Sequence, residues 1–184
     1  MVFIATCTID KSPLGPTADR SHFVGQGEDY HVYSQVIKSM FLDENTKLVV
    51  IRDSTVTYSL SNQIDYLMEH VPQLDSTLLA DYQLHNSRRT ALLRIPGLGI
   101  ECHLLSDAEL DDIFNNGWWP EFYQRFPHSG GYITFSSIGW SGDRETAILY
   151  ASRVRGRLAG AGYLVLLQKT QHWHIISSLL LWIS

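Results

Sequence analysis

The spacing of apolar positions predicts helices over much of the first two thirds of the chain. Apolar residues recur three or four positions apart over 30–42, 61–71 and 75–82, which is the period of one helix face. Ser106 and Glu109 have the spacing of a capping box, so a fourth helix is expected to begin there. Each of these helices needs another element against which its apolar face can be buried.

Runs of β-branched and aromatic residues predict the strands. Two short strands are expected at 47–58 and 100–105, and a third at the apolar segment 1–9. The last third of the chain holds four such runs separated by turn residues: 132–140, 146–154, 163–169 and 173–182. Consecutive strands joined by turns predict an antiparallel meander.

Helices followed by a block of strands are typical of the α+β class. We expect the helices to pack on one face of a curved C-terminal meander of about four strands. A cone-shaped sheet of this kind resembles the nuclear transport factor 2-like superfamily, by analogy of fold alone. Residues 1–184 are expected to form a single globular domain, with a loop-rich segment at 12–29 that contains several Pro and Gly residues.

The C-terminal part of the chain resembles a family of bacterial hypothetical proteins. The shared segments are WPEFYQRFPHSGGYI at 119–133, FSSIGW at 135–140, TAILY at 146–150 and GAGYLVLL at 160–167, with Trp173 and the closing 182–184. The similarity covers the chain from 119 to its end and, more weakly, 33–53. That family has no assigned activity. The resemblance therefore implies a shared α+β architecture and supplies no catalytic residues.

Composition narrows the expected partners and compartment. Fourteen Lys and Arg against nineteen Asp and Glu give a net charge of −5 at pH 7, whereas nucleic-acid binders cluster excess positive charge. Neither nucleic acid nor an anionic membrane surface is an expected partner. No apolar run approaches the roughly 20 residues that span a bilayer. Cys7 and Cys102 are expected to be free thiols, which favours a soluble cytoplasmic protein.

Arg153 and Arg155 are the candidate ligand-binding residues. They share one face of a predicted strand, with Arg157 close behind, so their guanidinium groups could together bind a carboxylate or a phosphate. In the alternative they solvate an edge of the sheet or pair with an acidic segment. The acidic residues of that segment are Asp107, Glu109, Asp111 and Asp112.

His172 and His174 would lie on one face of a strand, a spacing found in some metal sites. A third ligand would have to come from Asp53, Glu101 or His103, and nothing in the sequence pairs with the two histidines. The alternative is a pair of exposed hairpin histidines. We expect no metal and no cofactor.

Asp53 is the candidate catalytic residue, as one half of a general acid and base pair with a distant histidine. The sequence has no Gly-x-Ser-x-Gly nucleophile elbow. The glycines at 156, 160 and 162 do not match a phosphate-binding loop, and a hairpin, a bulge or a close backbone approach explains them better.

The main hypothesis is a non-catalytic binding or protein-interaction module whose partner is a small anion or a protein. The alternative is a cofactor-independent enzyme, a hydrolase, isomerase or cyclase, that acts on a small molecule in a pocket between helices and sheet. The enzyme hypothesis predicts that Asp53, a histidine and Arg153 converge in a deep pocket. Ligand, reaction type and oligomeric state are left open.

Overall fold

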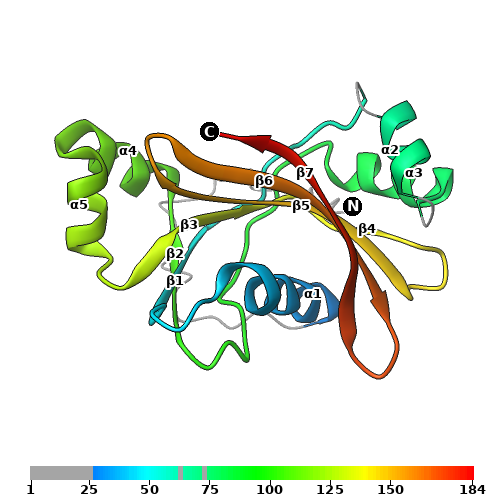
Figure 1. Ribbon diagram of the computed structural model, residues 1–184, viewed down its shortest axis with the longest axis horizontal. Coiled ribbons are helices and arrows are strands. Elements are labelled where there is room, and N and C mark those ends of the chain that lie inside the picture. The colour runs from blue at the N-terminus through cyan, green and yellow to red at the C-terminus, as the bar shows by residue number, and fades with distance from the viewer. Residues whose placement is uncertain (1–26, 62–63, 72–73) are drawn as a thin grey trace, which may run out of the picture.

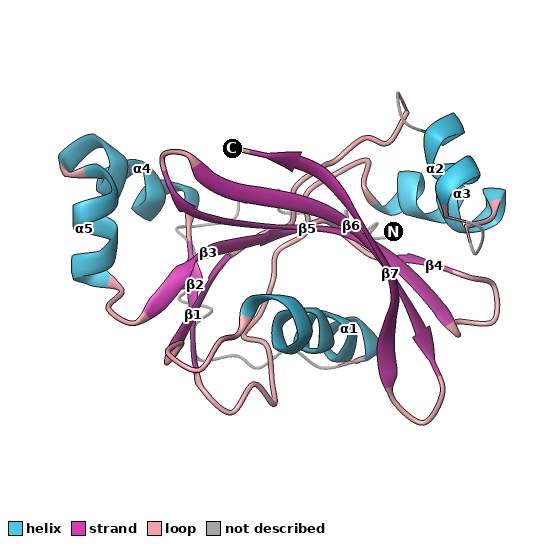
Figure 2. Ribbon diagram, in the orientation of Figure 1, coloured by secondary structure: helices cyan, strands magenta, loops and turns pink. Residues whose placement is uncertain are grey.

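The computed structural model describes residues 27–61, 64–71 and 74–184, which form an α+β fold around a mixed sheet (Figures 1 and 2). In the described residues the sheet has seven strands in the order β2-β1-β3-β5-β6-β7, and β4 pairs with β5 outside this path. The strands are β1 (Leu48–Arg52), β2 (Glu101–Leu105), β3 (Ser129–Phe135), β4 (Gly139–Trp140), β5 (Thr146–Gly156), β6 (Ala159–Lys169) and β7 (Trp173–Ile183).

The described chain also forms helices, two of which begin at a side-chain cap. The helices are α1 (Glu28–Val36), continued by the π-helical turn η2 (Ile37–Phe41), then α2 (Ile64–His70), α3 (Ser76–His85), α4 (Asp107–Asn116) and α5 (Trp118–Arg125). The Asp75 carboxylate accepts the Leu78 N–H at 2.7 Å and so caps α3. Ser106 Oγ accepts the Glu109 N–H at 3.1 Å at the start of α4, as the capping box predicts. The Glu109 side chain pairs instead with His103, at 3.1 Å.

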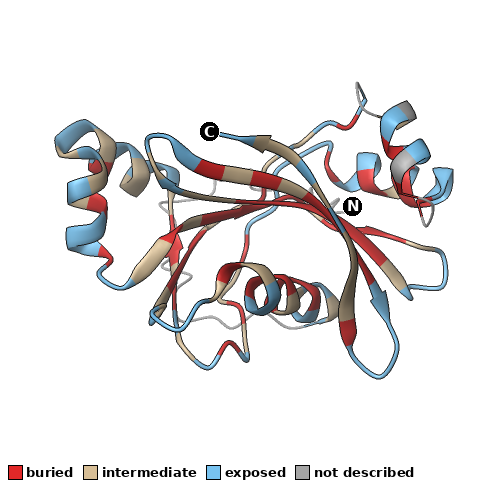
Figure 3. Cartoon of the chain, viewed as in Figure 1, coloured by how far each residue is buried: buried red, intermediate tan, exposed pale blue. Residues whose placement is uncertain are grey.

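Alternate residues of β5 point to opposite faces of the sheet, and helices cover both faces. Ala147, Leu149 and Ala151 belong to the core cluster formed with α1 and η2, which lie below the sheet in Figure 1. Ile148, between them, belongs to the cluster formed with α2 and α3 on the other face. The expectation that helices pack on one face only is therefore wrong. Buried residues accordingly run through the middle of the sheet (Figure 3).

The C-terminal meander is confirmed, since β5, β6 and β7 pair antiparallel in sequence order. Two details differ from the prediction. The strand expected at 132–140 is interrupted after Phe135 and resumes at Gly139, where a Cβ atom would lie 2.6 Å from the Tyr82 backbone of α3. The loop expected between β5 and β6 is a tight turn at 157–158, and Gly162 belongs to β6, where it leaves room for the Trp182 indole.

The first three strands of the sheet order are parallel neighbours, which the sequence did not predict. β1 pairs in parallel with β2 on one side and with β3 on the other. Each crossover is long enough to contain helices, and α4 and α5 pack their apolar residues on this end of the sheet. The strand predicted at 47–58 ends at Arg52, after which only single bridges at Ser54 and Val56 continue the pairing.

Several predictions fall on residues outside the described part of the chain. These are the strand at 1–9, the thiol of Cys7 and most of the loop at 12–29, whose last residues begin α1 at Glu28. Cys102 is a free, buried thiol, and burial raises its pKa. Among the described helices, none combines the length and apolar character needed to cross a membrane.

Candidate functional site

Arg153 and Arg155 extend the α1 face of β5 beyond the point where the covering helix ends. The small and aliphatic residues of β5 lie beneath α1 and η2, and η2 ends at Phe41. The strand alternation therefore brings two guanidinium groups to the position where the apolar core stops.

Contacts with the end of η2 fix Arg153. Its Nη1 donates a hydrogen bond to the Phe41 carbonyl oxygen at 2.8 Å, and its guanidinium carbon lies 5.5 Å from the centroid of the Phe41 ring. The side chain is half-buried, and loss of hydration lowers the pKa of the guanidinium, with a further lowering from the neighbouring Arg155. Arg153 is thus held in one orientation and remains a cation at neutral pH.

No carboxylate of the described residues forms an ion pair with Arg153 or Arg155. The acidic segment that was the alternative partner is engaged elsewhere: Asp107 with Arg52 and Arg89, Glu109 with His103, and Asp112 with Arg125. Asp43 interacts with Arg153 only over a longer distance, while its carboxylate accepts a hydrogen bond from Thr46 Oγ at 2.9 Å. The hypothesis that this acidic segment neutralises the two arginines is wrong.

The two arginines line a cavity of about 470 Å³, which we name the arginine cavity. Its remaining walls come from η2, from the β5–β6 turn, from β6 and from the end of β7; they are Met40, Phe41, Leu158–Ala161, Tyr163, Ile183 and Ser184. Arg155 is exposed, and its carbonyl oxygen accepts a hydrogen bond from the Tyr123 hydroxyl of α5 at 2.8 Å. The size lies within the range of small-molecule sites.

Asp53 lies apart from this cavity, directly after β1. Its carboxylate accepts a hydrogen bond from Ser54 Oγ at 3.0 Å, and its backbone bonds to Leu105 and Leu92. No hydrogen bond or ion pair joins Asp53 to a histidine in the part of the chain that the structure describes. The convergence of Asp53, a histidine and Arg153 that the enzyme hypothesis predicted is therefore not formed by these residues.

The two candidate metal ligands differ in their surroundings. His174 belongs to β7 and pairs with Gln168 of β6, whereas His172 precedes the strand in the β6–β7 turn. Within residues 27–61, 64–71 and 74–184 no group of three His, Cys, Asp or Glu side chains is arranged to hold a metal ion.

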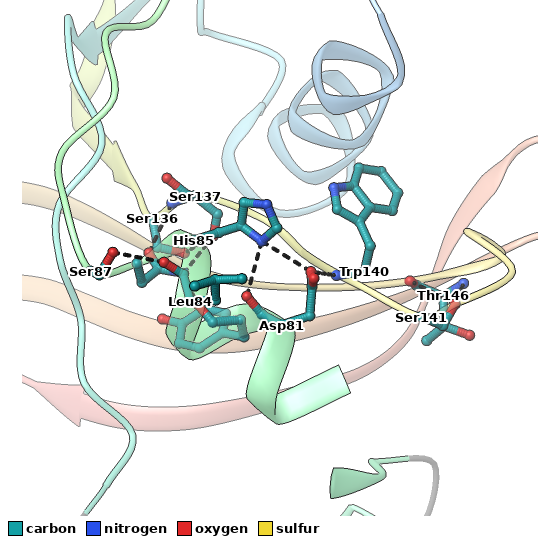
Figure 4. Close-up of polar contacts among 11 residues, drawn as sticks. Asp81, Leu84, His85, Ser87, Ser136, Ser137, Trp140, Ser141 and Thr146 are labelled. Atoms are coloured by element: carbon teal, nitrogen blue, oxygen red, sulfur yellow. Dashed lines mark hydrogen bonds and ion pairs between the residues drawn. The ribbon is translucent and has the colours of Figure 1, made fainter. Parts of the chain in front are cut away.

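One group of polar residues escaped the sequence analysis. His85, the last residue of α3, contacts the carboxylate of Asp81 one helical turn earlier through Nδ1 (Figure 4). The same carboxylate accepts a hydrogen bond from the backbone N–H of Trp140 in β4. The spacing of four residues between Asp81 and His85 is readable in the sequence. The contact with β4 depends on the tertiary fold, so no local pattern could have revealed it.

Comparisons of the chain with profiles of known protein families, with characterised proteins and with solved structures found no match. The functional argument therefore depends on the geometry of the cavities themselves.

Proposed function

We propose that this protein is a binding module for a small anion, a carboxylate or a phosphate, which it holds in the arginine cavity. The supporting observation is that Arg153 is fixed over Phe41 while neither it nor Arg155 has a carboxylate partner among the described residues. An oriented guanidinium group loses little conformational freedom when an anion binds. The paired forks also match the oxygen atoms of carboxylate and phosphate groups.

Binding is a better explanation of this cavity than catalysis. Apart from the two arginines, its lining side chains are apolar or carry only the hydroxyl groups of Tyr163 and Ser184. Among the described residues that line the cavity, no side chain is a carboxylate or an imidazole, the groups that most often move a proton in acid and base chemistry. The cone-shaped, nuclear transport factor 2-like form stays a prediction. The proposal does not depend on it, because the cavity is built at the β5–β6 turn.

Calorimetric titration of the protein with inorganic phosphate and, separately, with citrate tests the proposal. We expect at least one anion to bind. Replacing both arginines (Arg153→Gln with Arg155→Gln) should weaken that binding by about 30-fold, the equivalent of roughly 2 kcal/mol for two charged hydrogen bonds. Arg157→Gln is the matched control, because Arg157 lies in the adjacent turn and does not line the cavity.

The two titrations separate the sources of the anionic group. Tighter binding of phosphate would identify a phosphorylated ligand, and tighter binding of citrate would identify a carboxylic acid. If neither anion binds at about 10 mM, where even weak sites of millimolar affinity are filled, the proposal is wrong. Equal loss of affinity in the Arg157→Gln control would also contradict it, because the effect would then come from net charge.

A further inference from the structure

A second cavity, of about 520 Å³, lies between the N-terminal end of α1, the C-terminal end of α3 and strand β4. We name it the β4 cavity. Its polar lining includes Asp29, Tyr30, His85, Arg88 and Arg144, which come from three separate segments of the chain. Trp140, Leu92 and Ile138, all largely buried, supply an apolar wall.

The hydrogen bonds of His85 indicate which of its two ring nitrogens carries the proton. Nδ1 lies 3.0 Å from the Asp81 carbonyl oxygen and 3.1 Å from Asp81 Oδ2 (Figure 4). Both of these atoms accept hydrogen bonds, so Nδ1 carries the proton. In the neutral ring Nε2 is then a hydrogen-bond acceptor. The backbone N–H of Trp140 donates a hydrogen bond of 2.7 Å to Asp81 Oδ2 and so holds the carboxylate in place.

Asp29 adds a second acceptor beside His85. The surrounding protein limits the hydration of its carboxylate and so raises its pKa, while the charge of Arg144 partly opposes this shift. Asp29, His85 and Arg144 all line the β4 cavity. Within the described residues Asp29 forms no ion pair with either of them.

Arg144 and Tyr30 supply donors to the same space. The Arg144 guanidinium lies 5.0 Å from the centroid of the Trp140 ring, and its backbone is held in a left-handed conformation, φ 59°, within the β4–β5 turn. Arg144 and Arg88 form no ion pair among the described residues. The Tyr30 hydroxyl accepts the Leu93 N–H at 2.9 Å, so its own proton stays available for a ligand.

Local roles explain the position of each residue but not their convergence. An acidic residue in the first turn of α1 and a histidine in the last turn of α3 both suit the dipoles of their helices. Neither role accounts for the fact that the two residues line one cavity together with Arg88 and Arg144. A strained, non-glycine turn residue such as Arg144 persists only where the surrounding structure supports it, and such residues cluster at binding sites.

We propose that the β4 cavity binds a small zwitterion of the α-amino acid class. The ligand carboxylate would be held by Arg144, Arg88 and the Tyr30 hydroxyl, and the ligand ammonium group by Asp29 and His85 Nε2. This site is separate from the arginine cavity, since the two share no lining residue. It would recognise two opposite charges, whereas the arginine cavity would recognise one.

Two-dimensional NMR of the full chain, titrated with each of the common L-amino acids, tests this proposal. We expect at least one amino acid to shift the Trp140 indole resonance, because that ring forms part of the cavity wall. The carboxamide of that amino acid, which lacks the carboxylate, and its N-acetyl derivative, which lacks the ammonium group, should each bind about tenfold or more weakly.

Single substitutions assign the two ends of the ligand. Arg144→Gln should weaken the amino acid about tenfold or more and leave its carboxamide unaffected. Asp29→Asn should weaken the amino acid similarly and leave the N-acetyl derivative unaffected. Arg155→Gln is the control that should change neither affinity. If Arg144→Gln fails to fold, Tyr30→Phe removes a donor to the carboxylate without removing a charge.

The proposal is overturned if no amino acid shifts the Trp140 resonance at about 10 mM. It is equally overturned if the carboxamide and the N-acetyl derivative bind as tightly as the parent compound. Loss of binding in Arg155→Gln would place the ligand in the arginine cavity instead, and would leave the proposed function standing while this inference fails.

Discussion

Two pairs of arginines in this protein differ in their partners. Arg52 and Arg89 converge on Asp107, with Arg89 Nη1 at 2.7 Å and Nη2 at 3.2 Å from its two carboxylate oxygens. Arg153 and Arg155 have no ion pair within the described chain. The first pair joins β1, the 87–92 segment and α4, so its charge is used within the fold.

This difference distinguishes arginines that form ion pairs within the fold from arginines that are available to a ligand. A pair that shares a carboxylate within the fold leaves less attraction for a second anion, whereas a fixed pair without such a partner among the described residues retains more of its field. Arg52 also has a buried Nε that makes no hydrogen bond, and burial lowers its pKa. The contact of Arg52 and Arg89 with Asp107 therefore leaves a polar group of Arg52 unsatisfied inside the fold. Arg153 and Arg155 instead line a cavity that a ligand can enter.

Removing the internal carboxylate should have the largest effect on folding. Asp107→Ala would leave the largely buried Arg52 beside Arg89 without its ion-pair partner, so we expect a loss of about 2 kcal/mol in the free energy of unfolding. Urea denaturation measures this. Glu44→Ala is the control, because Glu44 is an exposed carboxylate with no ion pair among the described residues, and it should change stability by no more than about 0.5 kcal/mol. Equal effects would remove the distinction between the two pairs.

Removing the cavity arginines should affect binding far more than folding. The double variant, Arg153→Gln with Arg155→Gln, loses one hydrogen bond to Phe41 and no ion pair, so stability should fall by about 1 kcal/mol or less. Urea denaturation of this variant alongside Asp107→Ala gives the comparison directly. A loss of several kcal/mol would show that Arg153 is structural.

A carboxylate introduced into the arginine cavity should give Arg153 and Arg155 an ion-pair partner within the fold, as Arg52 and Arg89 already have. Ala161 of β6 lies directly opposite Arg153 of β5 and on the same face. Ala161→Glu should therefore compete with an added anion and stabilise the fold by about 0.2 to 1 kcal/mol. Ala161→Gln, of the same size without charge, is the control. If both variants bind the anion as the wild type does, the proposed location of the anion is wrong.

The smallest expected effect concerns Asp43 and Asp29, two carboxylates whose pKa values are shifted in opposite directions. Asp43 accepts hydrogen bonds from Thr46 and Asn45 that lower its pKa, so its charge stabilises the fold above the unfolded value of about 3.9, and that contribution is lost as the pH falls. The pKa of Asp29 is raised, so its charge destabilises the fold above its folded pKa.

Thermal unfolding between pH 7 and pH 3 checks this contrast. At pH 7 Asp43→Asn should melt below the wild type and Asp29→Asn above it, and both differences should shrink toward low pH. A lower melting temperature for Asp29→Asn at pH 7 would show that Asp29 stabilises the fold, which contradicts its proposed role as an unpaired ligand group.

Local patterns predicted local features of this protein. The helix at Ser106 began as its capping residues indicated, and the runs after Thr146 formed the expected meander because adjacent strands need only short turns. Parallel pairing of β1 with β2 and β3 was missed, because it joins strands separated by long stretches of chain. The same limit applies to helix placement on both faces of the sheet.

The candidate site was predictable only in part for the same reason. Strand alternation placed Arg153 and Arg155 on one face, but nothing in the sequence indicated that Phe41 would hold Arg153 or that Asp107 would be occupied by Arg52 and Arg89. Whether a charged side chain is free for a ligand depends on distant residues. A list of candidate residues from sequence therefore needs the structure before any of them can be ranked.

NMR of the arginine side chains compares the two pairs most directly. The Nε–H resonances of Arg153, Arg155, Arg52 and Arg89 can be followed in one sample while phosphate or citrate is added. The account predicts that the signals of Arg153 and Arg155 shift and saturate together, while those of Arg52 and Arg89 remain in place because Asp107 already occupies them. Shifts confined to Arg52 and Arg89, or equal and unsaturated shifts at all four, would contradict it.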